Sequence, residues 1–204
     1  GILGLGILMG GAWAYEALTF GGYWAWDPVE NMSLVPWIML VAGIHSHLVA
    51  RSTGHSLKAT FVFYILTFFL VVYSTFLVRS GILEETSVHA FVESGLERQL
   101  FVFLAFFPIL AFATYIYHYR KIPTPNKEER LQSREFWMFT GTMVLGISAI
   151  LITYFTSLPV INAIASYFDP LHEPLVINDP VDHYNKNQLW IALLIGLLSG
   201  VGQW

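Results

Sequence analysis

Long apolar runs divide this chain and constrain its fold more than any other feature. They cover residues 1–19, 33–50, 59–78, 100–119, 136–155 and 189 to the end. Each complete run is near the roughly 20 residues that a helix needs to cross a bilayer. Only 12% of the residues are charged, against about a quarter in soluble domains. The sequence therefore predicts an all-α fold: a polytopic transmembrane helical bundle with about five complete spans and a partial sixth.

The charges between these runs predict how the bundle is oriented. Ten of the fourteen acidic residues lie in the segments 20–32, 80–98 and 157–188. Because lysine and arginine favour the cytoplasmic side, we expect these three segments to face outwards, to the periplasm in a bacterium. Seven of the ten basic residues lie in the other connections: Arg51, Lys58, Arg120, Lys121, Lys127, Arg130 and Arg134.

Composition also restricts the organisation and the chemistry. We find no soluble domain, so residues 1–204 are predicted to form one membrane-embedded domain, an internal piece of a longer protein because both ends are apolar. The chain has no cysteine, which excludes disulfides, thiolate metal sites and a thiol nucleophile. No phosphate-binding or nucleic-acid-binding pattern occurs, so the lipid bilayer is the first expected partner.

The segment "GGYWAWDPVENMSLVPW", residues 21–37, is unusually rich in aromatic rings. Two interpretations compete. Tryptophan and tyrosine favour the headgroup level of a bilayer, and the order Asp27-Pro28-Val29-Glu30 is typical of a helix start with a capping box. Alternatively, Tyr23, Trp24 and Trp26 form a surface for a large, flat, apolar ligand, which Gly21 and Gly22 would allow to approach the backbone closely.

Two histidines bear on that choice. His45 lies inside an apolar run, eight residues after Trp37 and on the same helix face, where it could form an interhelical hydrogen bond or ligate a metal. His89 lies in the external segment 80–98, where it is either an ordinary polar residue or an axial ligand of haem iron. Arg79, at the same rim, either extends to the membrane surface or binds a haem propionate.

Two motifs resemble those of a known family. "GGYWAWDPVEN" followed by "PWIMLVAGIHS" resembles the WWD signature of the cytochrome c assembly, haem-handling superfamily, and is more similar to CcmF/NrfE haem lyases than to the CcsA branch. "STFLVRSGILEETSVHAF" resembles the segment of those lyases that carries an external histidine. The resemblance covers most of residues 10–160.

The resemblance implies two sets of haem-binding residues. His45 matches the transmembrane histidine that ligates haem b, and His89 matches an external histidine that binds the haem being delivered. The core of the haem-presenting motif is matched by Gly21, Gly22, Trp24, Trp26 and Asp27. The sequence departs from the family where Phe20 and Tyr23 replace tryptophans and where Glu84 and Glu85 lengthen the loop before His89. The second axial ligand of each iron would lie outside this sequence, and nothing in the resemblance makes His172 or His183 a ligand.

The implied function is that of a haem lyase component in the bacterial inner membrane. It would present transiently bound substrate haem for thioether attachment to apocytochrome c, together with a haem chaperone and other cytochrome c maturation subunits. Quinol is the suggested electron donor in the family. Two alternatives stay open: a haem exporter or carrier, and a quinol-linked b-type redox protein that needs only His45.

Overall fold

The computed structural model describes residues 1–17, 22–84, 86–87, 95–125 and 133–201. These residues form helices and turns and contain no strand, which confirms the predicted all-α class. The helices are α1 (Ile2–Ala17), α2 (Pro28–Thr53), α3 (Leu57–Arg79), α4 (Glu97–His118), the short 3-10 helix η1 (Tyr119–Lys121), α5 (Arg134–Thr156), α6 (Leu158–Phe168) and α7 (Pro180–Val201).

Four of the described helices are long and apolar enough to cross a membrane: α2, α3, α4 extended by η1, and α5. The multi-pass membrane fold is therefore confirmed, with four complete spans by this measure rather than the predicted five. Helix α1 has 16 residues, which is short for a span. Helix α7 has 22 residues, but its first two turns are polar.

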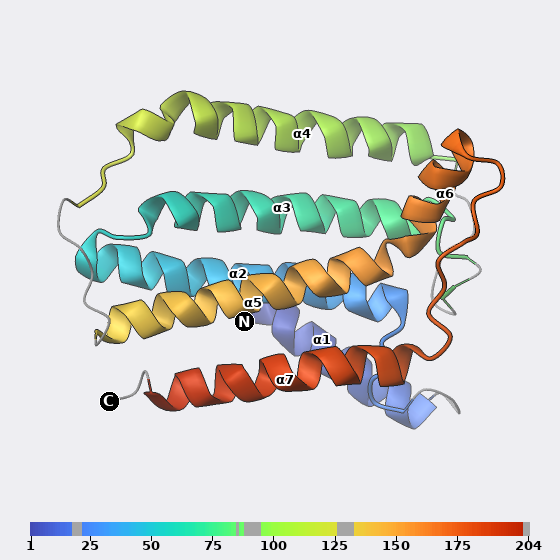
Figure 1. The fold of residues 1–204 in the computed structure, drawn as a ribbon, viewed down its shortest axis with the longest axis horizontal. Coiled ribbons are helices and arrows are strands. Elements are labelled where there is room, and N and C mark those ends of the chain that lie inside the picture. Colours follow the sequence, from blue (N-terminus) through green and yellow to red (C-terminus); the bar gives the residue numbers. More distant parts are fainter. Residues whose placement is uncertain (18–21, 85, 88–94, 126–132, 202–204) are drawn as a thin grey trace.

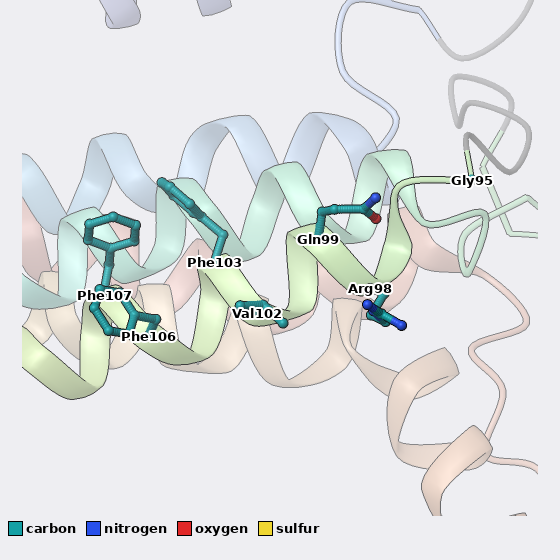
Figure 2. Close-up of a pocket in the computed structure, with 7 residues that line it drawn as sticks. All are labelled: Gly95, Arg98, Gln99, Val102, Phe103, Phe106 and Phe107. Atoms are coloured by element: carbon teal, nitrogen blue, oxygen red, sulfur yellow. The ribbon is translucent and has the colours of Figure 1, made fainter.

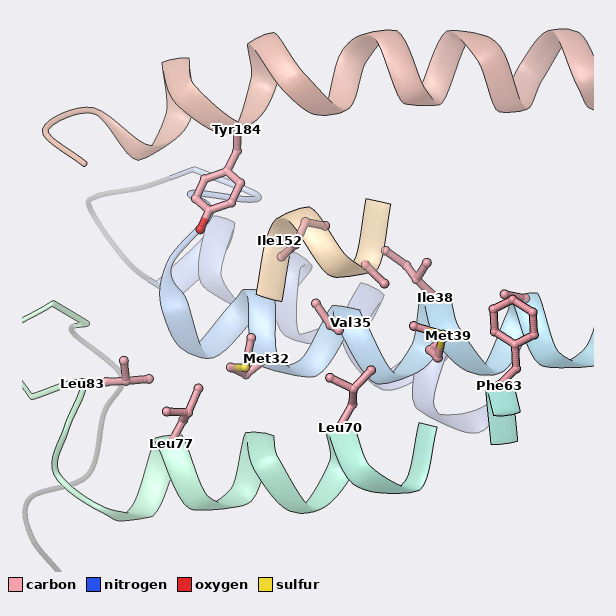
Figure 3. Packing of buried hydrophobic residues seen from close by; sticks show 12 residues of the cluster. Met32, Val35, Ile38, Met39, Phe63, Leu70, Leu77, Leu83, Ile152 and Tyr184 are labelled. Atoms are coloured by element: carbon pink, nitrogen blue, oxygen red, sulfur yellow. The ribbon is translucent and has the colours of Figure 1, made fainter. Parts of the chain in front are cut away.

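Helix α2 is the centre of the bundle. It packs against α3 on one side and α5 on the other, with α4 beyond α3 and α7 beyond α5 (Figure 1). Helix α1 also packs against α2, at a point where Gly4 lies directly on the Trp37 indole. The core is correspondingly built on the α2 residues Met32, Val35 and Met39, which interdigitate with side chains of α3 and α5 (Figure 3).

The connections sort to two ends of the bundle as the charges predicted. The α2–α3 turn, the end of α4 and the start of α5 lie at one end, which we call the basic end (Figure 1). The start of α2, the end of α3, the start of α4 and the end of α5 lie at the other, the aromatic end (Figure 1). Arg51, Lys58 and Arg134 are at the basic end, whereas Trp26 and Arg79 are at the aromatic end.

The segment 157–188, predicted as a loop, contains α6 and the first turns of α7. Helix α7 begins at Pro180, nine residues before the apolar run that predicted it. The local reason is an Asp-Pro helix start: the Asp179 carboxylate accepts a hydrogen bond from the Asp182 amide at 2.9 Å. This earlier start adds two polar turns to α7, and they reach the aromatic end.

Candidate functional site

The aromatic segment enters α2 through the predicted capping box. The Asp27 carboxylate accepts a hydrogen bond from the Val29 amide at 2.9 Å. Glu30 reaches back and accepts from the amides of Asp27 and Ala25, at 3.1 and 3.0 Å. Both carboxylates thus satisfy amides that a helix start leaves without partners. The prediction of a helix cap at Asp27 and Glu30 is confirmed.

Trp26 has a left-handed backbone and is held in it by several contacts. Its φ is +56°, a conformation that costs a residue with a side chain on the order of 1–3 kcal/mol. Its indole N–H donates to the Asn185 side-chain oxygen at 2.8 Å, and its ring stacks on Tyr184. The Asn31 amide donates to the Trp26 carbonyl at 3.1 Å. The indole ring of Trp26 is therefore held by α7, and its backbone carbonyl is held by α2.

A buried polar network joins α2, α5 and α7 beneath Trp26. The Asn31 amide also donates to the Thr156 hydroxyl at 3.1 Å, and that hydroxyl lies 3.0 Å from the hydroxyl of Tyr184. Asn31, Thr156 and Tyr184 are all buried. Burial raises the pKa of Tyr184, so its hydroxyl stays neutral and available for hydrogen bonding.

The neighbouring rings are also engaged within the protein. The Tyr23 hydroxyl donates to the Leu8 carbonyl at 3.0 Å, and its ring lies against Gly11 of α1. Trp24 meets Trp26 edge to face at 5.9 Å, and its indole nitrogen is buried without a hydrogen-bond partner among the described residues. Gly22 adopts the left-handed φ of +63° and is exposed. Trp24 thus has a buried donor that no described residue uses.

The beginning of the external segment 80–98 contacts the aromatic segment. The Ser87 hydroxyl donates to the Asp27 carboxylate at 2.7 Å. This hydrogen bond brings the chain to within two residues of His89. His89 itself and Gly21 lie outside the described residues, so their predicted roles stay predictions. Arg79 is exposed at the end of α3, on the same end of the bundle.

His45 lines a cavity of about 520 Å³ between α2, α5 and α7, which we call the inner cavity. Its Nδ1 lies 2.8 Å from the Val41 carbonyl oxygen of the same helix. A carbonyl oxygen only accepts, so Nδ1 carries the proton and Nε2 keeps its lone pair for a metal. Trp37 lines the same cavity, which confirms that it shares a helix face with His45.

A second cavity, of about 570 Å³, adjoins the first towards the aromatic end, and we call it the outer cavity. Trp26 and Asn185 line it at one end. Four residues line both cavities: Trp37, Ile38, Leu145 and Ile195. The two cavities are therefore neighbours along α2, α5 and α7, with Trp26 at the outer cavity and His45 at the inner cavity.

The sequence reasoning missed the part of α7 that completes this site. The sequence predicts a loop over Tyr184, Asn185 and Gln188. Instead, Tyr184 stacks on Trp26, Asn185 accepts the hydrogen bond from its indole, and Gln188 lines the outer cavity. The Asp-Pro start at Asp179 was the available signal, since the same pair begins α2. The contact with Trp26 itself has no local sequence signal.

Two other histidines lie on the aromatic side. The Nε2 of His172 lies 3.3 Å from the side-chain oxygen of Asn162, within the α6–α7 segment. His183 packs edge to face on Phe155, with ring centroids 4.3 Å apart. Its Nε2 is buried and has no hydrogen-bond partner among the residues that the structure describes. Among all the residues that the structure describes, no three His, Asp or Glu side chains lie close enough together to hold a metal ion.

A separate hollow of about 570 Å³ runs along α4 (Figure 2). Phe103, Phe106 and Phe107 line it, with Arg98 and Gln99 towards the aromatic end. None of the described residues that the sequence analysis singled out for haem lines this hollow. It is an exposed apolar face of the helix farthest from α7.

Comparisons with known proteins agree with the motifs. A family model described as cytochrome C assembly protein matches residues 2–83. A cytochrome c-type biogenesis protein CcmF of Pseudomonas aeruginosa is 39% identical over 96% of this chain and 29% of its own length. That of Escherichia coli is 32% identical over 98% of this chain and 30% of its own length. NrfE of Haemophilus influenzae is 44% identical over 54% of this chain and 17% of its own length.

This chain thus spans less than a third of the length of these relatives. No solved structure matches it.

Proposed function

We propose, on the premise that this chain belongs to the CcmF/NrfE type of cytochrome c assembly protein, that it is a haem-binding membrane component of cytochrome c maturation. It would hold haem b at His45 and present a second, substrate haem at the aromatic end for covalent attachment to apocytochrome c. No catalytic residue is assigned, because the work of this chain is to bind and orient.

The arrangement of His45 is the observation that carries this proposal. Its Nδ1–H is fixed by the Val41 carbonyl, as the outer nitrogen of a metal-ligating histidine usually is. Its ring borders a cavity whose volume of about 520 Å³ falls within the roughly 300–1,000 Å³ of small-molecule sites. The described cavity wall is apolar apart from a few donors, which suits a porphyrin. The residues present therefore fit haem.

The aromatic end supports the second haem site. The hydrogen bond from Ser87 to Asp27 joins the external segment to the aromatic segment two residues before His89 in the sequence. Aromatic faces cover a flat porphyrin well, and an imidazole is a common axial ligand of its iron. When bound there, the haem supplies vinyl groups to which cysteine S–H bonds add: sulfur joins one vinyl carbon, hydrogen joins the other, and no net electrons are exchanged.

The partners and the location follow from the same proposal. Since the chain lacks cysteine, the thiols come from apocytochrome c, and a haem chaperone and other maturation subunits bring the reactants. An electron from quinol, passed on by the haem at His45, would keep the iron of the presented haem reduced. We place the chain in the bacterial inner membrane with the aromatic end in the periplasm, because the basic end carries most of its lysines and arginines.

Haem spectra of the natural full-length protein test the proposal. We would purify the wild type and the variants His45→Ala and His89→Ala in detergent, record reduced-minus-oxidised spectra, and measure cytochrome c maturation in cells. We expect His45→Ala to lose a stable b-type signal. We expect His89→Ala to keep that signal while no longer yielding covalent cytochrome c.

Other outcomes select the alternatives. If His45→Ala loses the b-type signal and His89→Ala changes neither spectrum nor maturation, the protein is a quinol-linked b-type redox protein. If maturation fails only when haem does not reach the periplasm, it is an exporter or carrier. If neither substitution has any effect, both haem sites are wrong, and the tryptophans are an interface belt.

A further inference from the structure

We infer that Arg134 binds a haem propionate in the inner cavity, so that the haem proposed at His45 has its acid edge towards the basic end of the bundle. This inference rests on the proposed function and adds to it an orientation and a new binding residue. In the sequence, Arg134 contributes only to the charge pattern that predicts the cytoplasmic side.

The first support is the position of Arg134 on α5. Arg134 lines the inner cavity together with Trp137, Met138, Gly141 and Leu145. Their spacing of three, four, seven and eleven residues from Arg134 is that of one helix stripe. Arg134 is the first residue of α5 and so stands at the basic end of this stripe. The cavity thus runs from a cation at its mouth to an imidazole and apolar walls deeper inside.

The charge of the cavity is the second support. Arg134 is the one Lys, Arg, Asp or Glu among the described residues that line it, and no carboxylate faces it there. The guanidinium makes no hydrogen bond or ion pair with the described residues. A haem carries two carboxylates on one edge, and a guanidinium binds a carboxylate through two parallel hydrogen bonds. The cavity is therefore complementary to haem in charge as well as in size.

Gly141 supplies the third support and a control position. A Cβ placed on Gly141 would meet nothing within 4 Å, although the residue lies between α2 and α7 on the cavity stripe. The cavity stripe of α5 is therefore open at this position. Alanine here should be tolerated, whereas phenylalanine would occupy the space that we assign to the porphyrin.

The test uses the natural full-length protein with haem bound, purified in detergent. We would compare the wild type with Arg134→Gln, with Arg134→Lys, and with Arg51→Gln as a matched control that removes a basic-end charge outside the cavity. The readouts are the rate of haem transfer to apomyoglobin, the reduced-minus-oxidised spectrum and the midpoint potential. A second pair, Gly141→Phe against Gly141→Ala, probes the same space without changing charge.

We expect Arg134→Gln to keep the His45-dependent spectrum but to release haem about tenfold faster, the loss of roughly one charge-assisted hydrogen bond. Its midpoint potential should fall, because removing a nearby positive charge favours ferric iron. Arg134→Lys should release haem at an intermediate rate, and Arg51→Gln at the wild-type rate. Of the two glycine variants, Gly141→Phe should lose haem and Gly141→Ala should keep it.

The inference is overturned if Arg134→Gln matches Arg51→Gln in both rate and potential. It is also overturned if Arg134→Lys, used where the glutamine variant does not accumulate, releases haem at the wild-type rate. A wild-type protein without haem, or a His45→Ala variant that keeps it, would instead sink the proposed function. Failure of the inference alone leaves the His45-dependent spectrum in place, so the two failures are distinguishable.

Discussion

The indole ring of Trp26 stacks on the phenol ring of Tyr184, with centroids 5.1 Å apart and planes inclined by 14°. This pair joins the segment before α2 to the first turns of α7. One face of Trp26 is therefore occupied within the protein, and the residue fixes the aromatic segment in place. The buried indole nitrogen of Trp24, by contrast, has no hydrogen-bond partner among the described residues.

Replacing Tyr184 should separate the stacking from the hydrogen bonds. Tyr184→Ala removes a buried ring and should lower the free energy of unfolding by about 3 kcal/mol. Tyr184→Phe keeps the stack but leaves the Thr156 hydroxyl without this partner, at a cost of about 1 kcal/mol. Thermal unfolding in detergent, followed by circular dichroism, measures both. Equal losses would show that the hydroxyl network, not the stack, holds α7.

Alkaline pH should loosen the same connection. Burial raises the pKa of Tyr184 above its ordinary value of about 10. The neutral hydroxyl therefore contributes its full stability below pH 10, and the contribution is lost as the pH rises through the folded-state pKa. The apparent melting temperature, measured from pH 8 to 11, should fall less steeply in Tyr184→Phe than in the wild type. Parallel curves would contradict this role.

The close approach of α2 and α3 depends on Gly43. A Cβ at Gly43 would lie 2.9 Å from a ring carbon of Tyr64, closer than real contacts allow. Gly43→Ala should therefore destabilise the bundle by about 1–3 kcal/mol. Gly196→Ala is the matched control, since nothing lies within 4 Å of the added carbon and alanine favours helix. Comparing their melting temperatures tests this; equal values would show that Tyr64 moves aside freely.

Two of the contacts that Asp27 makes with described residues, the helix cap and the hydrogen bond from Ser87, can be removed one at a time. Asp27→Ala should cost about 1–2 kcal/mol, because it removes the helix cap as well as the bond from Ser87. Ser87→Ala removes the second contact but leaves the helix cap, and should cost less. If Asp27 also touched substrate haem, Asp27→Asn would reduce cytochrome c maturation without a matching loss in melting temperature, which measuring both quantities would reveal.

His183 should be dispensable for haem. Its Nε2 is buried without a described partner, so His183→Phe removes an unsatisfied polar atom and preserves the packing on Phe155. We expect unchanged haem spectra and a melting temperature equal to or above that of the wild type. A loss of haem absorbance in this variant would make His183 an iron ligand and revise the assignment of both sites.

Local patterns in the sequence were sufficient for much of this structure. Apolar runs of span length predicted α2, α3, α4 and α5 to within a few residues of their observed bounds. The order Asp27-Pro28-Val29-Glu30 predicted the capping box, because every contact in a cap lies within one helical turn. The eight-residue spacing of Trp37 and His45 predicted one shared face for the same reason.

Contacts between distant segments were not predictable in this way. The bond from Trp26 to Asn185 spans 159 positions, and no periodicity in either segment encodes it. The two polar turns of α7 were missed because hydropathy marks the apolar part of a helix and ignores its polar beginning. The inner cavity likewise depends on how α2, α5 and α7 pack, which a single sequence does not specify.

The link between Trp26 and Asn185 also sets an order of events during synthesis. A ribosome adds residues from the amino end, so the aromatic segment and α2 are made and inserted well before α7 exists. Until α7 arrives, Trp26 lacks both its stacking partner and the acceptor for its indole N–H. The aromatic segment therefore reaches its final conformation late, and a partly inserted chain has an unfinished outer surface. The contacts of Trp26 with Tyr184 and Asn185 can thus form only after α7 has been inserted into the bundle.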